Sequence, residues 1–496
     1  MAGFGDAFSL VNLAFVLFGV VVGQFVGAVP GIGPVMAMAI AIPFTFGLDP
    51  LPAIAFLVGV NKGGLVGGAV PAVLMNTPGT PDAAATALDG YPLAQQGKPL
   101  KATKMALFAS ITGDTFSDIV LITVSAPLAV LALTMGPVEI VALMIFTFSV
   151  LTGLMGRSLL KGVISAALGL LFAAIGVDPE NSTPRLLFGM WDLYDGLPLV
   201  SVAIGMLAIS EILRRLSRSK GVVKPAVEID ATGKPEDSRV SFAEYWSCRF
   251  TMLRGAAIGT VLGAIPGIGS TAAAFMSYAF AKASSKNPES FGKGNIKGIA
   301  AAESANSAVV GANLIPLLTL GIPGSVGAAL IISAFMIHGL QPGPLLFQEQ
   351  GRLVYGLFGA MVLANVINLC VGQLGLRLWV KVVSAPESVI FSSALLLCIV
   401  GVSMATGGLF GVGVMLVFAV IGYLMSSFGY SVIIFIIAFF LGPRFEISIS
   451  QMLALTNSEP PQIVNYPVAL ALLLLSLLSF IWFWFRNKKA EAELKD

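Results

Sequence analysis

The distribution of apolar and polar residues along the chain is that of a protein that crosses a membrane many times. Nearly uninterrupted apolar stretches, close to the roughly 20 residues that a membrane-spanning helix needs, recur throughout the sequence. They cover approximately residues 9–29, 53–75, 105–135, 137–156, 159–177, 197–213, 353–374, 388–404, 408–441 and 466–485. The pattern predicts an all-α polytopic membrane protein with about ten to twelve transmembrane segments or hairpins.

Helix breakers interrupt these apolar stretches at matching places in the two halves of the chain. The string GAVPGIG at residues 27–33 returns 236 residues later as GAIPGIG at 263–269. Pro71 with NTPGT at 76–80 returns 245 residues later as Pro316 with GIPGS at 321–325. Broken backbone within a bilayer is tolerated where its freed polar groups are buried in protein or line a polar cavity. Paired breaks of this kind indicate the substrate site of a transporter.

The basic residues predict how the chain is oriented in the membrane. The stretch 214–254 contains nine Lys and Arg residues, and the C-terminus carries Trp482, Trp484, Arg486, Lys488 and Lys489. Both regions are expected on the cytoplasmic side. The N-terminus is expected on the periplasmic side, because Asp6 is the single charged residue among its first 48 residues. We therefore predict two inverted-topology repeats with broken helices, residues 1–213 and 251–496, joined by a basic cytoplasmic linker at 214–250.

The loops that follow the two PGIG strings support this inversion. The first, residues 44–52, contains Asp49 and no basic residue, whereas its counterpart holds Lys282, Lys286, Lys293 and Lys297. Equivalent loops are therefore expected on opposite sides of the membrane. The same charges place both flanks of each PGIG string on one side, so each string is predicted to lie at the tip of a re-entrant hairpin.

Composition agrees with a membrane protein and removes several other classes. Hydrophobic residues make up 56% of the chain and charged residues 11%, against a charged share of about 25% in soluble proteins. Mean hydropathy is +0.91. A net charge of +2 gives no reason to expect a nucleic-acid partner. The three cysteines have no metal-site or disulfide spacing, so neither a metal centre nor a disulfide framework is expected. No Lys or Arg precedes Lys62, so the first apolar segment is expected to remain in the mature protein.

The breakers are the candidate substrate-binding residues. A Pro-Gly turn exposes unpaired N–H groups where a half-helix begins, and the positive end of its dipole then faces an anion such as a carboxylate. The other explanation of a single such string is a kink or a tight helix crossing, and duplication at inverted positions favours the site. The candidates are Pro30, Gly31, Ile32, Gly33, Asn76, Thr77, Pro78, Gly79, Thr80, Pro266, Gly267, Ile268, Gly269, Ser270, Thr271, Pro323, Gly324 and Ser325.

Ionisable and amide residues inside apolar stretches are further candidates, because each is costly in hydrocarbon. Lys62 either pairs with a substrate carboxylate or makes an intramolecular pair with Asp82 or Asp89. Asp114 and Asp118 share one helix face and either hold a proton or cation or form a solvated interfacial cap. Asn61 and Asn306 match at the offset of 245 and suit ligation of an ion. Glu303 is an ion-coupling candidate or a helix cap, and His338, the only histidine, is expected to be structural.

Other chemistries find little support in the sequence. It contains no GxxxxGK[ST], HExxH or GxSxG string, so nucleotide hydrolysis by a P-loop and the corresponding hydrolases are not indicated. We predict that the protein is not an enzyme, with an intramembrane enzyme using Asp114 and Asp118 as the least favoured alternative. A passive anion channel is the stronger alternative, because broken helices also line pores. Coupling to an ion gradient distinguishes a carrier from a channel.

Long strings within the chain resemble the large membrane subunit of the tripartite tricarboxylate transporters. They are GAVPGIGP, NKGGLVGGAVPAVLMNTPGTPDAAATALDGYPLAQQGKPLKA, GAIPGIGST and ESANSAVVGANLIPLLTLGIPGSVGAALIISAFMIHGLQPGPLLF. The resemblance implies a secondary transporter of the bacterial inner membrane that takes up small di- or tricarboxylates. It also implies two partners, a periplasmic solute-binding protein and a small second membrane subunit. The expected coupling ion is sodium or a proton, and no other cofactor is expected.

Overall fold

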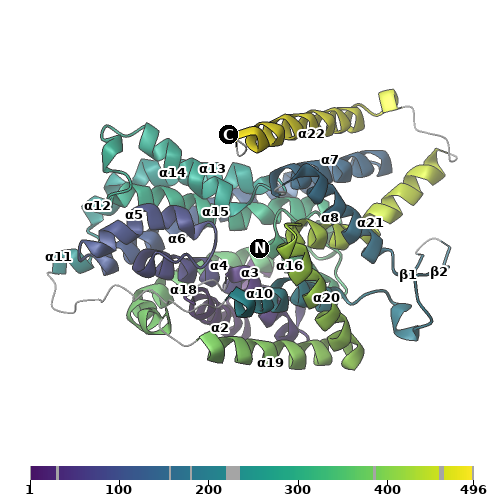
Figure 1. The fold of residues 1–496 in the computed structure, drawn as a ribbon, viewed down its shortest axis with the longest axis horizontal. Coiled ribbons are helices and arrows are strands. Elements are labelled where there is room, and N and C mark those ends of the chain that lie inside the picture. The colour runs from purple at the N-terminus through teal and green to yellow at the C-terminus, as the bar shows by residue number, and fades with distance from the viewer. Residues whose placement is uncertain are drawn as a thin grey trace. The chain divides into compact units, whose positions relative to one another are not determined.

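Helices form most of the computed structural model, which describes residues 2–29, 33–155, 158–178, 181–218, 235–383, 387–456 and 463–493 (Figure 1). Seven of the described helical segments are long and apolar enough to cross a membrane. These segments are Leu10–Gly27, Pro50–Met75, Pro99–Ala132, Gly351–Gly375, Leu409–Ser427, Val432–Leu455 and Pro467–Phe485. Shorter apolar helices add Pro34–Thr45, Pro137–Gly153, Leu159–Ala173, Val326–Ile337 and Phe391–Thr406. The predicted all-α polytopic class is confirmed.

The chain packs into two compact units. The first comprises Met1–Ala129, Ser219–Ile265 and Gly269–Leu397, and the second comprises Val130–Arg218, Pro266–Ile268 and Cys398–Asp496. Each unit therefore combines segments from both halves of the sequence. The division into repeats 1–213 and 251–496, and their inversion, stay predictions. Much of the linker predicted at 214–250 lies outside the described residues.

The first unit is built from helices alone among its described residues. In chain order these are α1 Ala2–Asp6, α2 Leu10–Gly27, α3 Pro34–Ala41, the 3-10 helix η1 Ile42–Thr45, α4 Pro50–Met75, α5 Ala83–Gln95, α6 Pro99–Ala132, α11 Pro235–Ser238, α12 Phe242–Ser247, α13 Arg249–Ala264, α14 Gly269–Ala283, η4 Pro288–Ser290, α15 Ile296–Leu320, α16 Val326–Ile337, α17 Leu346–Glu349 and α18 Gly351–Val383. The last residues of α6 pass into the second unit, which also takes the C-terminal part of α19 Glu387–Thr406.

The described part of the second unit contains the remaining helices and one small hairpin. Its elements are α7 Pro137–Met155, α8 Leu159–Ala173, β1 Gly176–Val177, β2 Pro184–Arg185, η2 Trp191–Leu193, α9 Leu199–Ile204, the π-helix η3 Gly205–Ile209, α10 Ser210–Arg218, α20 Leu409–Ser427, α21 Val432–Leu455, η5 Ile463–Asn465 and α22 Pro467–Glu493. The two strands pair antiparallel. Phe172 of α8 packs edge-on against Phe418 of α20, and such ring contacts fill this unit.

Helices α4 and α15 form the core of the first unit and end in the same way. Nearly every residue of both is buried. Each contains a proline near its C-terminus, Pro71 and Pro316, and each stops at a residue in the left-handed conformation. These are Asn76, with φ 53°, and Gly321, with φ 70°. A left-handed residue after a helix is a common C-terminal stop for which asparagine and glycine are suited, so the second pair of predicted breakers does end two helices.

Glycines bring a neighbouring helix against each of these core helices. On α2, a Cβ added to Gly19, Gly23 or Gly27 would lie 2.3 Å from a backbone oxygen of α4. On α13, a Cβ added to Gly259 would lie 2.2 Å from the Ala305 oxygen of α15. Gly255, Gly259 and Gly263 follow the three glycines of α2 at the same offset of 236. Small residues at this spacing allow close helix packing in membranes. The sequence duplication therefore includes the glycines that bring α2 against α4 and α13 against α15.

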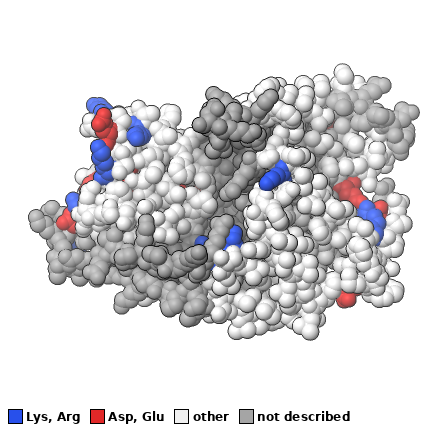
Figure 2. Space-filling model, viewed as in Figure 1, with Lys and Arg blue, Asp and Glu red and all other residues white. Residues whose placement is uncertain are grey.

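The described surface has the character expected of a protein in a bilayer. Figure 2 shows a face on which uncharged residues predominate, with few Lys, Arg, Asp or Glu side chains. Short helix α12 carries exposed Phe242 and Trp246 with stacked rings, and the Arg249 guanidinium lies 5.0 Å from the Trp246 ring. Aromatic and basic side chains of this kind are enriched at the membrane interface.

Candidate functional site

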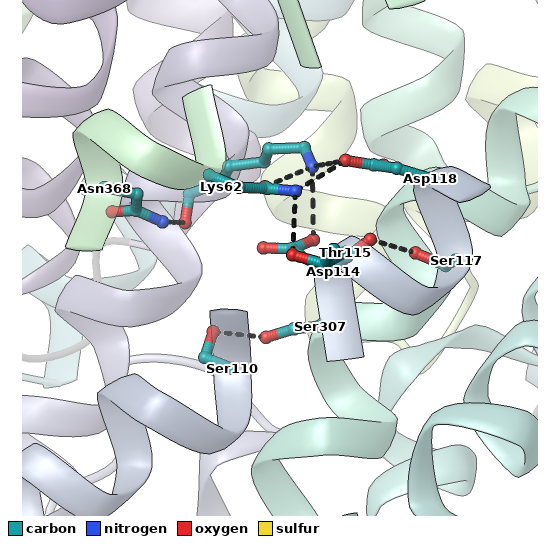
Figure 3. Close-up of polar contacts among 9 residues, drawn as sticks. Lys62, Ser110, Asp114, Thr115, Ser117, Asp118, Ser307 and Asn368 are labelled. Carbon is teal, nitrogen blue, oxygen red and sulfur yellow. Dashed lines mark hydrogen bonds and ion pairs between the residues drawn. The ribbon is translucent and has the colours of Figure 1, made fainter. Parts of the chain in front are cut away.

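Lys62 is the centre of a buried ionic cluster in the first unit. Its side chain, on α4, has no exposed surface. The ammonium donates to Asp118 Oδ2 at 2.6 Å and to Asn365 Oδ1 at 2.7 Å, and it lies 3.5 Å from Asp114 Oδ1. Figure 3 shows the lysine nitrogen between the two aspartates of α6. An intramolecular pair is thus present, with Asp114 and Asp118 as the partners in place of Asp82 or Asp89.

Amide side chains hold this cluster in place. Asn365 Nδ2, on α18, donates to Asp118 Oδ2 at 2.8 Å, and Asn368 Nδ2 donates to the Lys62 backbone oxygen at 3.2 Å. Gln24 Nε2, on α2, donates to the Asn368 backbone oxygen at 3.0 Å. The network joins α2, α4, α6 and α18. One lysine stands against two carboxylates, so with both aspartates ionised the cluster keeps one net negative charge.

A second acidic cluster lies where α5 meets α15. Thr86 Oγ1 donates to Glu303 Oε1 at 2.5 Å. The Asn306 side chain lies close enough to interact with the carboxyl groups of both Asp82 and Glu303. The hydroxyls of Thr80 and Ser270 lie close to Asp82. Predicted candidates Glu303, Asn306, Thr80 and Ser270 are therefore brought together.

A serine pair lies along the helices that carry the two clusters. Ser110 of α6 and Ser307 of α15 approach to 2.5 Å (Figure 3). Ser110 is one turn before Asp114, and Ser307 is one turn after Glu303. Gly113 allows the two helices to touch, because a Cβ there would lie 2.1 Å from the Ser304 backbone oxygen. The buried polar residues therefore form one track along α6 and α15.

Asp89 has a different surrounding from the other buried acids. Its Oδ1 accepts backbone N–H groups of Gly292, Gly294 and Asn295 at 2.8–2.9 Å, and its Oδ2 accepts the Tyr278 hydroxyl at 2.9 Å. All four donors come from α14 and the loop after it. A carboxylate with this many donors is fully satisfied without a cation. Asp89 fastens that loop to α5.

The second pair of breakers begins two half-helices. Ser325 caps α16 by accepting from Ala328 N at 3.2 Å, and Thr80 Oγ1 accepts from Ala83 N at 3.3 Å at the start of α5. A Cβ on Gly327 would lie 3.5 Å from Asn61 Nδ2, so Asn61 is beside the start of α16. The remaining candidates of this pair lie in the same two turns: exposed Asn76 and Thr77, partly buried Pro78, and buried Gly79, Pro323 and Gly324.

The PGIG strings are described in part. Pro30, Gly31 and Ile32 lie outside the described residues. Gly33 caps α3, with Pro34 at the first helical position and no side chain satisfying its N–H groups, and a Cβ there would lie 3.0 Å from Thr80 Cγ2. In the second string, after Pro266, Gly267 has φ +91° and Gly269 φ +74°, with Ile268 between them and Thr271 in the first turn of α14. Convergence of the four breakers on one ligand stays a prediction.

The only histidine of the chain lies at the end of α16. Burial lowers the pKa of His338, which lies near Thr45 and Asp49 from the first half of the sequence. The imidazole is therefore neutral near pH 7. His338 occupies a helix cap, where sequence analysis expected a structural residue.

Several polar residues of the clusters were not among the candidate site residues, and Asp82, Thr86 and Asn365 are the ones closest to the carboxylates. Asp82 and Thr86 follow a Pro- and Gly-rich turn, where polar residues are ordinary. Asn365 lies in the apolar run MVLANVINLC, and an amide in such a run was the signal that would have identified it. No group of three or more His, Cys, Asp or Glu side chains that could hold a metal ion occurs among the described residues.

These features define a polytopic membrane protein with broken helices and buried polar clusters in one compact unit. The chain belongs to the tripartite tricarboxylate transporter TctA family, whose model matches residues 13–437. The protein is therefore a subunit of the transporters of that family, which is a transporter family and not an enzyme family. Membership implies a binding protein and a small membrane subunit as partners.

Two relatives from Agrobacterium vitis are similar to the chain. One, the "Uncharacterized 52.8 kDa protein in TAR-I ttuC' 3'region", is 33% identical over 481 residues, which are 96% of this chain and 93% of that protein. The other, the "Uncharacterized protein in TAR-II ttuC' 3'region", is 34% identical over 223 residues, 45% of this chain and 92% of that protein. No solved structure matches the chain significantly.

Proposed function

We propose that this protein imports small di- or tricarboxylates by secondary active transport. It receives the substrate from a periplasmic solute-binding protein and works with a small membrane subunit in the bacterial inner membrane. A sodium or proton gradient drives the uptake. The observation that carries this proposal is the family match across residues 13–437, which includes both pairs of breakers.

The half-helix N-termini are the proposed carboxylate-binding groups. Gly33 has no side chain that could cap α3, and N–H groups left uncapped at a helix N-terminus attract an anion. Ser325, Gly327 and Asn61 at the start of α16 carry no charge and therefore suit a carboxylate better than the start of α5, where Asp82 would repel it. Alternating access would then move these hairpins relative to a fixed framework.

Lys62 is positively charged, but it is a poor candidate for binding the substrate carboxylate. Its ammonium contacts two oxygens at 2.6 and 2.7 Å and a third at 3.5 Å. Binding a substrate carboxylate would require it to leave Asp118. We propose that Lys62 instead balances the aspartates, and that Asp114, whose two oxygens have no hydrogen-bond partner among the described residues, is the member of this cluster free to take a proton or cation.

Uptake into proteoliposomes tests the proposal. The protein, its small membrane subunit and the binding protein are combined, and labelled di- and tricarboxylates are offered with sodium and proton gradients imposed separately. Accumulation that saturates, requires one gradient and depends on the binding protein supports a coupled carrier. Fast, unsaturable flux without a gradient would identify a passive anion channel.

A first prediction concerns orientation in the membrane. Single cysteines at Asp49 and Asn287, both exposed, should react with an impermeant thiol reagent from opposite sides, because Asp49 lies in an acidic loop and Asn287 in a lysine-rich one. The background must lack exposed Cys370 as well as buried Cys248 and Cys398. Labelling of both sites from the same side would show that the two repeats are parallel.

A further inference from the structure

Asp82 and Glu303 are buried acids with unsatisfied oxygens. Their exposed fractions are 4% and 0%. Among the described residues, Asp82 Oδ2, Glu303 Oε2 and the amide oxygen Asn306 Oδ1 have no hydrogen-bond partner. Burying a polar acceptor without a donor is costly, and burying an ionised carboxylate without a partner costs far more. Three such oxygens in one cluster indicate that a positively charged ligand completes it.

No lysine or arginine among the described residues makes an ion pair with Asp82 or Glu303. The other buried acids of this unit lie beside a lysine or accept several hydrogen bonds. Even Asp114, whose oxygens have no hydrogen-bond partner within the described part of the chain, lies 3.5 Å from the Lys62 ammonium. Asp118 pairs with Lys62 at 2.6 Å, and Asp89 accepts four hydrogen bonds. Unbonded oxygens also occur at Asp114 and Asp118, but both of these acids face Lys62. Asp82 and Glu303 differ from the other buried acids because the described residues give them neither a cation nor a full set of donors.

The matching positions in the other half of the sequence carry no acids. At the offset of 245, Asp82 corresponds to Gly327, Glu303 to Val58 and Thr86 to Ile331. The matched asparagine Asn61 lies beside Gly327, as Asn306 lies beside Asp82. The matched positions thus carry neutral and apolar residues in one half of the sequence and two carboxylates in the other.

We propose that Asp82 and Glu303, with Asn306 and the hydroxyls of Thr80 and Ser270, bind a sodium ion. Carboxylate, amide and hydroxyl oxygens are ligands of hard cations, whereas sulfur and imidazole ligands favour transition metals. The proposal rests on the proposed function, in which this ion would be the coupling ion. The sodium site adds specific ion-binding residues to the proposed function.

Thermal unfolding of the purified full-length protein in detergent tests the site without measuring transport. Sodium chloride is compared with choline chloride and potassium chloride at equal ionic strength. A ligand that binds the native state raises its stability with concentration, so sodium should raise the Tm by roughly 3 °C or more when near-saturating. Potassium and choline should have little effect.

Isosteric variants locate the effect. Glu303→Gln and Asp82→Asn should lose the sodium-dependent rise, and each should have a higher Tm than the wild type in sodium-free buffer, because one unpaired buried charge has been removed. Asp89→Asn is the matched control. It also neutralises a buried acid, but one with four donors, so it should lower the Tm and keep the sodium response.

A milder variant keeps the test decisive if the acid variants do not fold. Thr86→Val retains the shape of the side chain and removes the hydroxyl that donates to Glu303. It should shift the sodium concentration at half-maximal effect by about tenfold, the size expected for a hydrogen bond to a charged group. An unchanged midpoint in Thr86→Val would contradict the site.

Two results would overturn the proposal directly. One is a wild-type sodium response that persists in both Glu303→Gln and Asp82→Asn. The other is stabilisation of the wild type by lower pH with none by sodium, which would make the ligand a proton. Carboxylate uptake by a wild type that shows no sodium response would refute the site and leave the transport function standing. A sodium response lost in the variants, with no carboxylate uptake by the wild type, would refute the function and leave the site standing.

Discussion

The two buried acidic clusters of the first unit differ in what balances their charge. At Asp114 and Asp118 the chain supplies its own cation, Lys62, held by Asn365 and Asn368. At Asp82 and Glu303 the described residues supply hydroxyls and an amide and no cation. A permanently bound lysine suits a cluster that locks helices together. An incomplete set of oxygens suits a cluster that an ion enters and leaves.

The largest expected effect comes from removing the lysine. Lys62→Met should destabilise the protein by about 3–5 kcal/mol, because it leaves two buried carboxylates without their partner. Denaturant or thermal unfolding in detergent measures the loss. The triple variant Lys62→Met, Asp114→Asn, Asp118→Asn should recover most of it. A stable Lys62→Met would mean that the lysine does not balance these acids and would reopen its assignment to the substrate.

Substitution at the second PGIG turn should abolish uptake while the protein still inserts. Gly267 and Gly269 have positive φ, and valine in such a conformation costs about 1–3 kcal/mol. If the carboxylate binds at this turn and in neither acidic cluster, Gly267→Val and Gly269→Val should stop transport at normal expression. Gly413→Val is the matched control, since nothing lies within 4 Å of its added Cβ.

The amount of variant protein in the membrane and the uptake by Gly413→Val show how a loss of uptake at the turn is to be interpreted. A transport loss in Gly267→Val that merely follows loss of protein from the membrane would make the turn a packing device. Equal tolerance of valine at positions 267, 269 and 413 would place the carboxylate site elsewhere. In either case the second breaker pair, with Ser325 and Gly327, becomes the next place to look.

Neutralising Asp114 tests whether the lysine-containing cluster also couples transport to an ion. Asp114 has only the 3.5 Å contact to Lys62, and Lys62 keeps its shorter pair with Asp118, so Asp114→Asn should still fold and should cost far less stability than Lys62→Met. If the residual negative charge of this cluster holds the driving ion, gradient-driven accumulation should fall more than substrate exchange in proteoliposomes. Normal accumulation would restrict ion coupling to Asp82 and Glu303.

Local backbone chemistry made the helix ends predictable from sequence. Prolines at 71 and 316 and the Asn76 and Gly321 stops follow from constraints that each residue imposes on its own φ and on its hydrogen bonds. The membrane class followed equally directly from apolar runs of sufficient length. These features need no knowledge of which helices are neighbours.

The partners of the buried charges depend on tertiary packing and were harder to predict. For Lys62 the sequence left open a substrate carboxylate or an intramolecular pair with Asp82 or Asp89, which are close in sequence. In the structure α6 packs so that Asp114 and Asp118 reach it. Asp82 was weighed only as a partner of Lys62, because a polar residue after a Pro- and Gly-rich turn is unremarkable. Its importance comes from Glu303 and Asn306, more than 200 residues away in the sequence.

The smallest expected effect concerns the serines between the clusters. Ser110 and Ser307 form a buried 2.5 Å contact, and Ser110→Ala alone should cost about 1–3 kcal/mol because it leaves Ser307 unpaired. The double variant Ser110→Ala, Ser307→Ala should be nearly as stable as the wild type, since both partners are removed together. Its sodium-dependent Tm rise should also be unchanged, because neither serine contributes an oxygen to the site at Asp82 and Glu303. A weakened sodium response in the double variant would show that the two clusters act as one connected unit, and the distinction drawn between them would then fail.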